Sequence, residues 1–115
     1  MAHIVYSHTN DPDVKEPGKY ANTAVPALIN RMSTLGAKTE RLVAKIAGGA
    51  TMFRDSVIDI GKKNVKATKK LLRKYNIRIV GEDVGGYSNR YVKFFLEDGK
   101  VVITYGGTPK SYNII

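Results

Sequence analysis

Apolar positions along the chain recur at helical spacing in two segments, which predict two amphipathic helices. The first runs from Tyr20 to Leu35, and Gly36 stands where a left-handed C-cap ends such a helix. The second runs from about Ile60 to Tyr75, with Asp59 as its N-cap. The positions expected to face inward are Ala24, Val25, Leu28, Ile29, Met32 and Leu35 in the first helix, and Val65, Leu71, Leu72 and Tyr75 in the second. Each helix therefore has one face suited to packing on a core.

Shorter β-prone runs predict strands between and after these helices. They cover residues 2–6, 42–47, 77–80, 91–96 and 101–105. The last two runs are expected to form a hairpin through the turn at 97–100, whereas the glycines and proline of 106–115 predict an irregular tail. The order β, α, β, α, β, β, β predicts an α/β (α+β) fold, a mixed β-sheet sandwich with two main helices packed on it.

Two positions place special demands on the backbone. Pro26 fits the first helix only if regular hydrogen bonding starts near Asn22 or Thr23, which would put the proline in the first turn. The strand over 42–47 stops at Gly48 and Gly49, where the missing Cβ atoms permit a sharp turn or a close backbone approach. Backbone N–H groups of Gly48, Gly49 and Ala50 are candidate donors to an oxyanion or amide carbonyl, with a plain turn as the alternative.

Composition restricts the class of protein. The 115 residues and 12.7 kDa suit a single domain over residues 1–115, and no apolar run is long enough to cross a bilayer. The start Met-Ala-His-Ile-Val lacks the features of a secretory signal, and the chain has no cysteine. We therefore expect a cytoplasmic protein.

The net charge of +9 favours an acidic partner: nucleic acid, an anionic membrane surface or an acidic protein face. Seven cations lie on the second predicted helix with no acidic residue among them, and the candidate partner-binding residues are Lys62, Lys66, Lys69, Lys70 and Arg73. A basic helix is more often a solvated face, and its aromatic content is a single Tyr75. Charge alone does not choose among these interpretations.

His3 is the candidate general base, although on residue type alone a structural histidine is the more frequent case. His3 and His8 would point to opposite faces of a strand, and Asp11-x-Asp13 lacks the further ligands of a calcium loop. No nucleotide-binding glycine motif occurs. We therefore expect no metal and no cofactor.

Five segments, taken together and in this order, resemble the chemoreceptor glutamine deamidase family, the CheD proteins. They are residues 1–5 (MAHIV), 17–24 (PGKYANTA), 44–53 (AKIAGGATMF), 60–65 (IGKKNV) and 82–86 (EDVGG). The resemblance implies an α/β sandwich that hydrolyses selected chemoreceptor glutamine side chains to glutamate. It also implies a cysteine nucleophile paired with a histidine, and His3 falls on that histidine. The implied partners are the cytoplasmic helices of chemoreceptors and a CheC-type phosphatase.

The chain departs from the family at the nucleophile. The family's cysteine lies upstream of the histidine in a Gly-Ser-Cys segment, together with a threonine, whereas only Met1 and Ala2 precede His3 here. Ser7 is a poor substitute, because four residues of extended chain span roughly 13 Å. We expect a chain truncated relative to the family and inactive as it stands, which self-associates through an exposed sheet edge. The alternative is a non-catalytic basic module that binds nucleic acid or an acidic protein.

The family resemblance has smaller departures as well. They are Asn22 where the family usually has aspartate, Lys63 where arginine is common and Tyr87 where asparagine is frequent. These differences concern local contacts rather than the fold.

Overall fold

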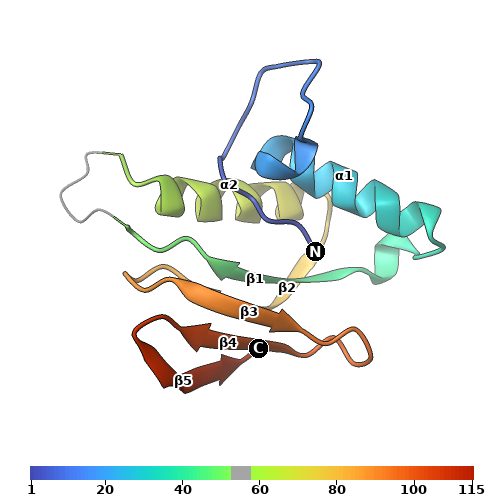
Figure 1. The fold of residues 1–115 in the computed structure, drawn as a ribbon. Coiled ribbons are helices and arrows are strands. Elements are labelled where there is room, and N and C mark those ends of the chain that lie inside the picture. Colours follow the sequence, from blue (N-terminus) through green and yellow to red (C-terminus); the bar gives the residue numbers. More distant parts are fainter. Residues whose placement is uncertain (53–57) are drawn as a thin grey trace.

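Helices and strands lie in three layers in the computed structural model, which describes residues 1–52 and 58–115, apart from the side chains of 108–110 (Figure 1). The first layer holds α1 (Ala21–Thr34) and α2 (Ile60–Lys74), and the second holds β1 (Val43–Gly48) and β2 (Arg78–Val84). The third holds β3 (Arg90–Phe94), β4 (Val101–Tyr105) and β5 (Thr108–Ile114), and short 3-10 turns occupy Pro17–Lys19 and Thr39–Arg41. The predicted α+β class with two packed helices is confirmed.

Strands of both orientations occur, divided between two sheets. β1 and β2 are parallel, whereas β3, β4 and β5 form an antiparallel sheet in that order. In the parallel pair the register shifts by one residue: Ala44 lies opposite Ile79, but Lys45 lies opposite Gly81, which leaves Val80 as an extra residue. Such a bulge exchanges the faces of the residues that follow it. Residues of β2 beyond Val80 therefore face the opposite way from a simple alternation.

The helix ends follow the local chemistry of the sequence. Asp59 caps α2, because its Oδ1 accepts a hydrogen bond from the Lys62 backbone N–H at 3.0 Å. α1 ends where Gly36 takes a φ of 102°, a conformation that favours glycine. Both predicted boundaries are confirmed.

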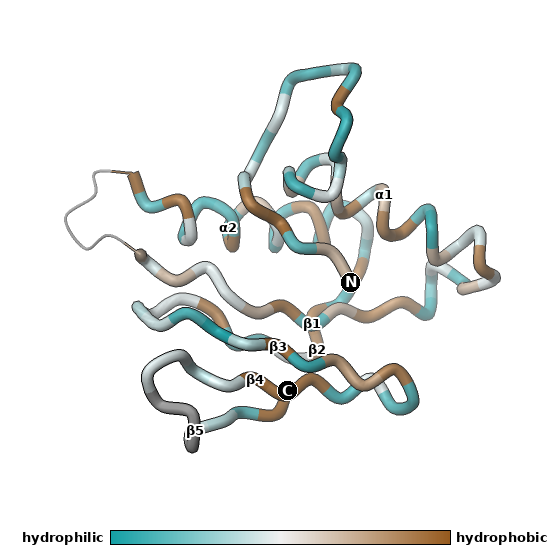
Figure 2. Tube along the Cα trace, in the orientation of Figure 1, coloured by the Kyte–Doolittle hydropathy of each residue, from teal (hydrophilic) through white to brown (hydrophobic). Residues whose placement is uncertain are grey.

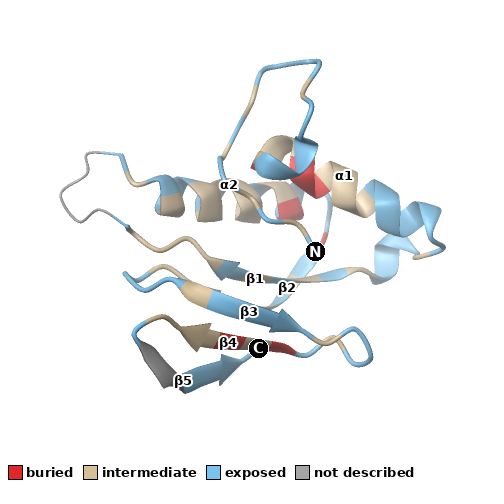
Figure 3. Cartoon of the chain, viewed as in Figure 1, coloured by how far each residue is buried: buried red, intermediate tan, exposed pale blue. Residues whose placement is uncertain are grey.

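Buried side chains concentrate in two places (Figure 3). One lies between the helices and the parallel pair, where Val25, Leu72 and Ile77 are buried together. The other lies in β4, where Val101 and Ile103 are buried. By contrast, hydrophilic residues dominate much of α2 and the loop over 7–18 (Figure 2). Each face of the middle layer is thus next to its own cluster of apolar side chains.

Residues 2–6 do not form the predicted strand. Tyr6 makes an isolated parallel bridge with Tyr20, and the N–H groups of Val5 and Tyr6 donate to the Lys19 carbonyl at 2.7 and 2.9 Å. The partner of this segment is the turn before α1, which is too short to continue a ladder. The β-prone residues therefore run as extended chain between the turn before α1 and helix α2.

The C-terminal tail is also more regular than predicted. Gly107, with a φ of 84°, lies in a tight turn, and β5 returns along β4 with Tyr112 opposite Thr104. The predicted strand over 77–80 likewise continues to Val84, because it pairs with β1 over that length. Backbone pairing thus forms strands in two segments, 81–84 and 108–114, whose glycine, proline or charged residues are typical of loops.

Three helix predictions need correction. Met32 and Leu35, expected to face inward, are 39% and 88% exposed, because the C-terminal end of α1 extends beyond the core around Val25. Pro26 is the sixth residue of α1 rather than part of its first turn, because the helix already starts at Ala21, with the Ala24 N–H donating to the Tyr20 carbonyl at 2.7 Å. Tyr75 is exposed at the end of α2, where Lys74 lies over its ring.

Candidate functional site

The glycine pair after β1 forms an elbow, Gly48–Ala50. Gly48 and Gly49 have φ values of 109° and 70°. The elbow pairs with the loop after β2, since the Gly85 N–H donates to the Gly48 carbonyl at 2.9 Å and the Thr51 N–H to the Gly86 carbonyl at 2.8 Å. The two glycine loops therefore support each other.

The elbow also packs directly on the first turn of α2. A Cβ placed on Gly49 would collide with the Val65 side chain and lie 3.0 Å from the Gly61 carbonyl oxygen. A Cβ on Gly61 would collide with the Ala50 carbonyl oxygen. The absence of side chains at both glycines thus lets two backbones touch, and the structure gives these residues a structural role beside the predicted one.

Asp59 ties the same two elements together. Its Oδ2 accepts a hydrogen bond from the Thr51 hydroxyl at 2.6 Å, while its Oδ1 caps α2. These bonds, first that from Thr51 and then that from the Lys62 N–H, lower the pKa of the Asp59 carboxyl. Asp59 is therefore ionised at neutral pH and anchors the elbow at the N-terminus of α2.

His3 is exposed on the N-terminal segment, and its side chain makes no hydrogen bond among the described residues. The segment itself is held by Asn64 of α2, whose Nδ2 donates to the Val5 carbonyl at 2.8 Å. His3 and the elbow are thus both attached to the N-terminal half of α2, one through Asn64 and the other through Gly61. Val5 and Gly49 both contact the N-terminal half of α2, whereas no hydrogen bond among the described residues joins the His3 side chain itself to the elbow.

An open pocket of about 450 Å³ lies between the N-terminal segment and the start of α2. Its walls include the rings of Tyr6 and Tyr20, stacked at 5.7 Å, together with His8 and Lys63. Neither His3 nor the elbow lines it. The pocket therefore lies next to the candidate site without containing its predicted residues.

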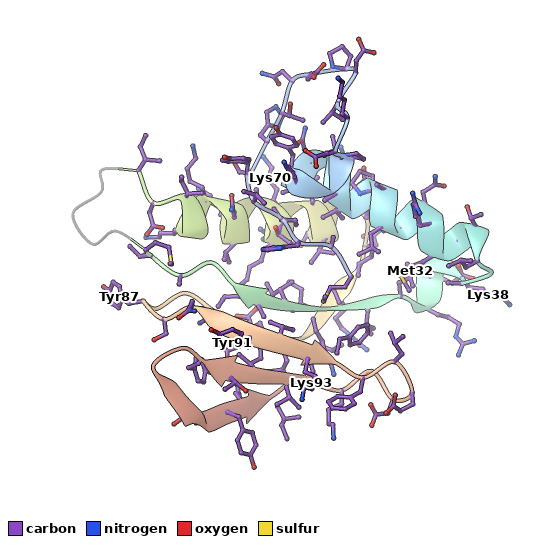
Figure 4. All side chains as sticks on the ribbon, viewed as in Figure 1. Met32, Lys38, Lys70, Tyr87, Tyr91 and Lys93 are labelled. Carbon is purple, nitrogen blue, oxygen red and sulfur yellow. The ribbon has the colours of Figure 1, made fainter. Side chains whose placement is uncertain are left out.

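The predicted partner-binding cations share one side of α2. Lys62, Lys66, Lys70 and Arg73 are exposed, and Lys69 makes an ion pair with Glu82 at 3.1 Å. Lys70 stands on the side of α2 turned away from the strands (Figure 4). The structure thus brings these five residues together on one side of the helix that begins at the elbow.

Sequence reasoning missed a buried polar cluster between the two sheets. Arg90 pairs with Asp83 at 3.0 Å, with side-chain exposures of 7% and 9%, and also donates to the Gly85 carbonyl at 2.8 Å. Tyr105 and Asn113 donate to the second carboxylate oxygen of Asp83. In the sequence, this cluster is indicated only by an acidic and a basic residue near the ends of consecutive predicted strands. The register shift in β2 turns the Asp83 side chain toward Arg90.

Asp83 responds to this environment. Burial by itself raises the pKa of its carboxyl, but the hydrogen bonds from Tyr105, Asn113 and Arg90 and the charge of Arg90 lower it more, so the pKa lies below its usual value. The bond to Asp83 raises the pKa of Tyr105. The cluster therefore holds a carboxylate and a neutral phenol at neutral pH.

Residues 1–52 and 58–115 contain neither a candidate metal site nor a candidate membrane-spanning helix. No group of three His, Asp or Glu side chains is placed to bind a metal ion there. No helix in that part of the chain is long and apolar enough to cross a membrane. Phe53, which closes the 44–53 motif, lies outside the described residues.

Comparison with known proteins gives a consistent result. Residues 6–105 match the family model described as CheD chemotactic sensory transduction. A Methanococcus vannielii protein named probable chemoreceptor glutamine deamidase CheD is 49% identical over 113 residues, which are 96% of this chain and 73% of that protein. The chemoreceptor glutamine deamidase CheD of Thermotoga maritima is 45% identical over 114 residues, 99% of this chain and 72% of that protein. The chain, with its glycine elbow packed on a basic helix, belongs to the CheD family of chemotaxis proteins.

Proposed function

We propose that this chain forms the greater part of a chemoreceptor glutamine deamidase and supplies its catalytic histidine, His3. The observation that carries the proposed activity is the family match over residues 6–105, together with relatives named for this activity. The role of His3, which lies before the matched residues, follows from the resemblance of residues 1–5 to the family's histidine segment. The elbow Gly48–Ala50 is the proposed substrate-binding segment, and its position beside the helix that holds the His3 segment supports this assignment.

The proposed chemistry is hydrolysis of a side-chain amide through a thioester. A cysteine thiolate attacks the amide carbon of glutamine, and the C–N bond breaks as His3 protonates the departing ammonia. Water then hydrolyses the thioester, which yields glutamate and regenerates the thiol. Backbone N–H groups of the elbow would stabilise the oxyanion that forms in each step.

These 115 residues contain no cysteine, so we propose that the chain is inactive by itself. A general base without a nucleophile cannot perform covalent acyl transfer. Ser7 does not replace the thiol, since it is four residues away from His3 along extended chain, roughly 13 Å.

The test compares the chain alone with a fusion that carries, before Met1, the Gly-Ser-Cys segment that the family resemblance implies. Both are incubated with the cytoplasmic fragment of a chemoreceptor, and mass spectrometry follows conversion of glutamine to glutamate together with ammonia release. We expect conversion by the fusion alone.

A fusion with His3→Ala is the matched control, because exposed His3 contributes nothing to the described packing. We expect its rate to fall by about a hundredfold or more, the usual contribution of a general acid–base. Conversion by the unfused chain would show that a cysteine is not required, and no conversion by a folded fusion would contradict the proposed function.

The proposal includes partners. Chemoreceptor cytoplasmic helices are the substrate, which requires a cytoplasmic location, and a CheC-type phosphatase is the partner implied by the family resemblance. β1 has β2 as its only strand partner among the described residues, and we propose that its free edge mediates self-association. The second candidate function, nucleic-acid binding, is supported by the net charge of +9.

A further inference from the structure

The five cations of α2 form a continuous stripe, Lys62, Lys66, Lys69, Lys70 and Arg73, which we call the basic stripe. At 100° per residue these positions fall within an arc of about 100°, and at 1.5 Å per residue the stripe is about 16 Å long. Lys63 and Lys74 continue the arc on one side. The five cations therefore lie on one face of the helix along most of its length.

The remaining sides of α2 are occupied. Leu72 is buried in the core, Val65 packs against Gly49, and Asn64 holds the N-terminal segment. The basic stripe is what is left, and four of its five cations have no ion-pair partner among the described residues. Lys69 pairs with Glu82, at exposures of 36% and 43%, where solvent screens the interaction. The stripe is thus an accessible, mostly unneutralised surface.

This arrangement costs helix stability. Lysine and arginine repeat at a spacing of four residues in the pairs Lys62–Lys66, Lys66–Lys70, Lys69–Arg73 and Lys70–Lys74. Like charges at that spacing destabilise a helix by roughly 0.2–0.5 kcal/mol per pair. The favourable placement of cations near the C-terminus covers only Arg73 and Lys74. Binding of an acidic partner by these cations would account for the lost helix stability.

The position of the stripe indicates its partner. α2 starts at the elbow, because Asp59 bonds to Thr51 and Gly61 touches the backbone of Gly49 and Ala50. A substrate helix whose glutamine reached the elbow could continue along α2. Carboxylates spaced three or four residues apart on that helix would repeat with the same period as the cations. The stripe also lacks aromatic side chains on which bases could stack, which disfavours single-stranded nucleic acid.

We propose that the basic stripe binds an acidic face of a chemoreceptor cytoplasmic helix and so aligns that helix with the elbow. This inference rests on the proposed function and names a docking surface for its substrate. Complementary charge of this kind mainly accelerates encounter and suppresses wrong registers.

The test is a pair of charge-reversal variants in the 115-residue chain. Lys66→Glu with Lys70→Glu changes the stripe, whereas Lys38→Glu with Lys93→Glu changes two exposed lysines elsewhere and alters the net charge equally. Lys38 and Lys93 lie well away from Lys70 (Figure 4). Affinity for a purified chemoreceptor cytoplasmic fragment is measured at low and at physiological salt, with duplex DNA and single-stranded RNA as competing probes.

We expect the stripe variant to bind the receptor fragment about tenfold more weakly at low salt, the control to stay within about twofold, and the difference to shrink as salt is added. Equal loss in both variants, unchanged affinity in the stripe variant, or no binding by the unmodified chain would overturn the proposal. Competition by DNA or RNA that depends on the stripe would assign it to nucleic acid instead.

A second experiment introduces the same two double substitutions into the cysteine-bearing fusion. It separates this inference from the proposed function. We expect the stripe variant to raise KM about tenfold with kcat little changed, because the stripe lies outside the reacting atoms. Deamidation with an unaltered KM would contradict docking on the stripe while leaving the deamidase assignment intact. Absence of deamidation in every folded fusion would contradict the assignment itself.

Discussion

Among individual residues, Asp83 links the two sheets through its carboxylate. It accepts hydrogen bonds from Arg90, Tyr105 and Asn113, which belong to three different strands of the antiparallel sheet. Arg90 also donates to the carbonyl of Gly48, the first residue of the elbow, and to that of Gly85 in the loop after β2. The Asp83–Arg90 ion pair is therefore one of the contacts that hold the candidate site.

Replacing Asp83 with Asn should lower the free energy of unfolding by about 3 kcal/mol at neutral pH, because a buried guanidinium loses its counterion. The carboxyl pKa is lowered in the folded state, so the stabilisation is present above the unfolded pKa of about 3.9 and is lost as pH falls through the folded value. Urea denaturation should show the gap between the two proteins narrowing below about pH 4.

Glu82→Gln is the matched control, because Glu82 is next to Asp83 in β2 but its carboxylate makes only an exposed ion pair with Lys69. It should change stability by less than about 1 kcal/mol at any pH. A gap between Asp83→Asn and the unmodified chain that stays constant down to acid pH would contradict the role assigned to the Asp83 charge.

At the scale of elements, the contact between the elbow and α2 depends on glycine. Glycine inside a helix ordinarily reduces stability relative to alanine by roughly 1 kcal/mol. In α2, however, a Cβ on Gly61 would lie 2.5 Å from the Gly49 carbonyl oxygen and 2.7 Å from its carbonyl carbon. Backbone atoms cannot yield as a flexible side chain does, so the helix can approach β1 closely only with glycine at this position.

Gly61→Ala should therefore destabilise the protein, by about 1–3 kcal/mol, although helix propensity alone predicts a gain. Thermal or urea unfolding provides the measurement. Gly18→Ala is the control, because no atom lies within 4 Å of the added Cβ and its φ is not positive; it should be neutral or slightly stabilising. A more stable Gly61→Ala protein would show that α2 and the elbow are not in close contact.

At the scale of the whole molecule, the middle layer is a sheet of only two strands, β1 and β2, among the described residues. Polar contacts link it to the antiparallel sheet, including Lys45, whose Nζ donates to the carbonyls of Gly99 and Ile115 at 2.7 Å each. Val43, at the start of β1, is 52% exposed. A short sheet with free edges is a template for a strand from another chain.

We expect the unmodified chain to form larger species as its concentration rises, and Val43→Lys to remain monomeric, since a charge on an edge strand opposes strand addition. Sedimentation velocity measures both. Leu35→Lys removes an 88% exposed apolar side chain outside any strand and should behave like the unmodified chain. A strictly monomeric unmodified chain at high concentration, or equal effects of the two substitutions, would contradict association through β1.

Local patterns predicted much of the fold because the signals lie within a few residues of the structure they produce. Helix periodicity, the cap at Asp59 and the glycine at position 36 set both helices, and the turn at 97–100 set the hairpin of β3 and β4. The same holds for the clustering of cations on one face of α2, which follows from helix geometry. The family resemblance, also a property of the sequence, predicts the elbow segment and His3 as site residues, and these roles stay predictions.

Contacts between distant residues decided the rest. Whether residues 2–6 and 108–114 become strands depends on the partner that the fold offers, the turn before α1 in one case and β4 in the other. The helices, the hairpin and the charge of α2 follow from local sequence, since they depend on neighbours along the chain. The pairing of Asp83 with Arg90 depends instead on the packed fold, because the extra residue Val80 in β2 exchanges the faces of the residues after it. A register shift of one residue leaves no mark in a periodic pattern of the sequence.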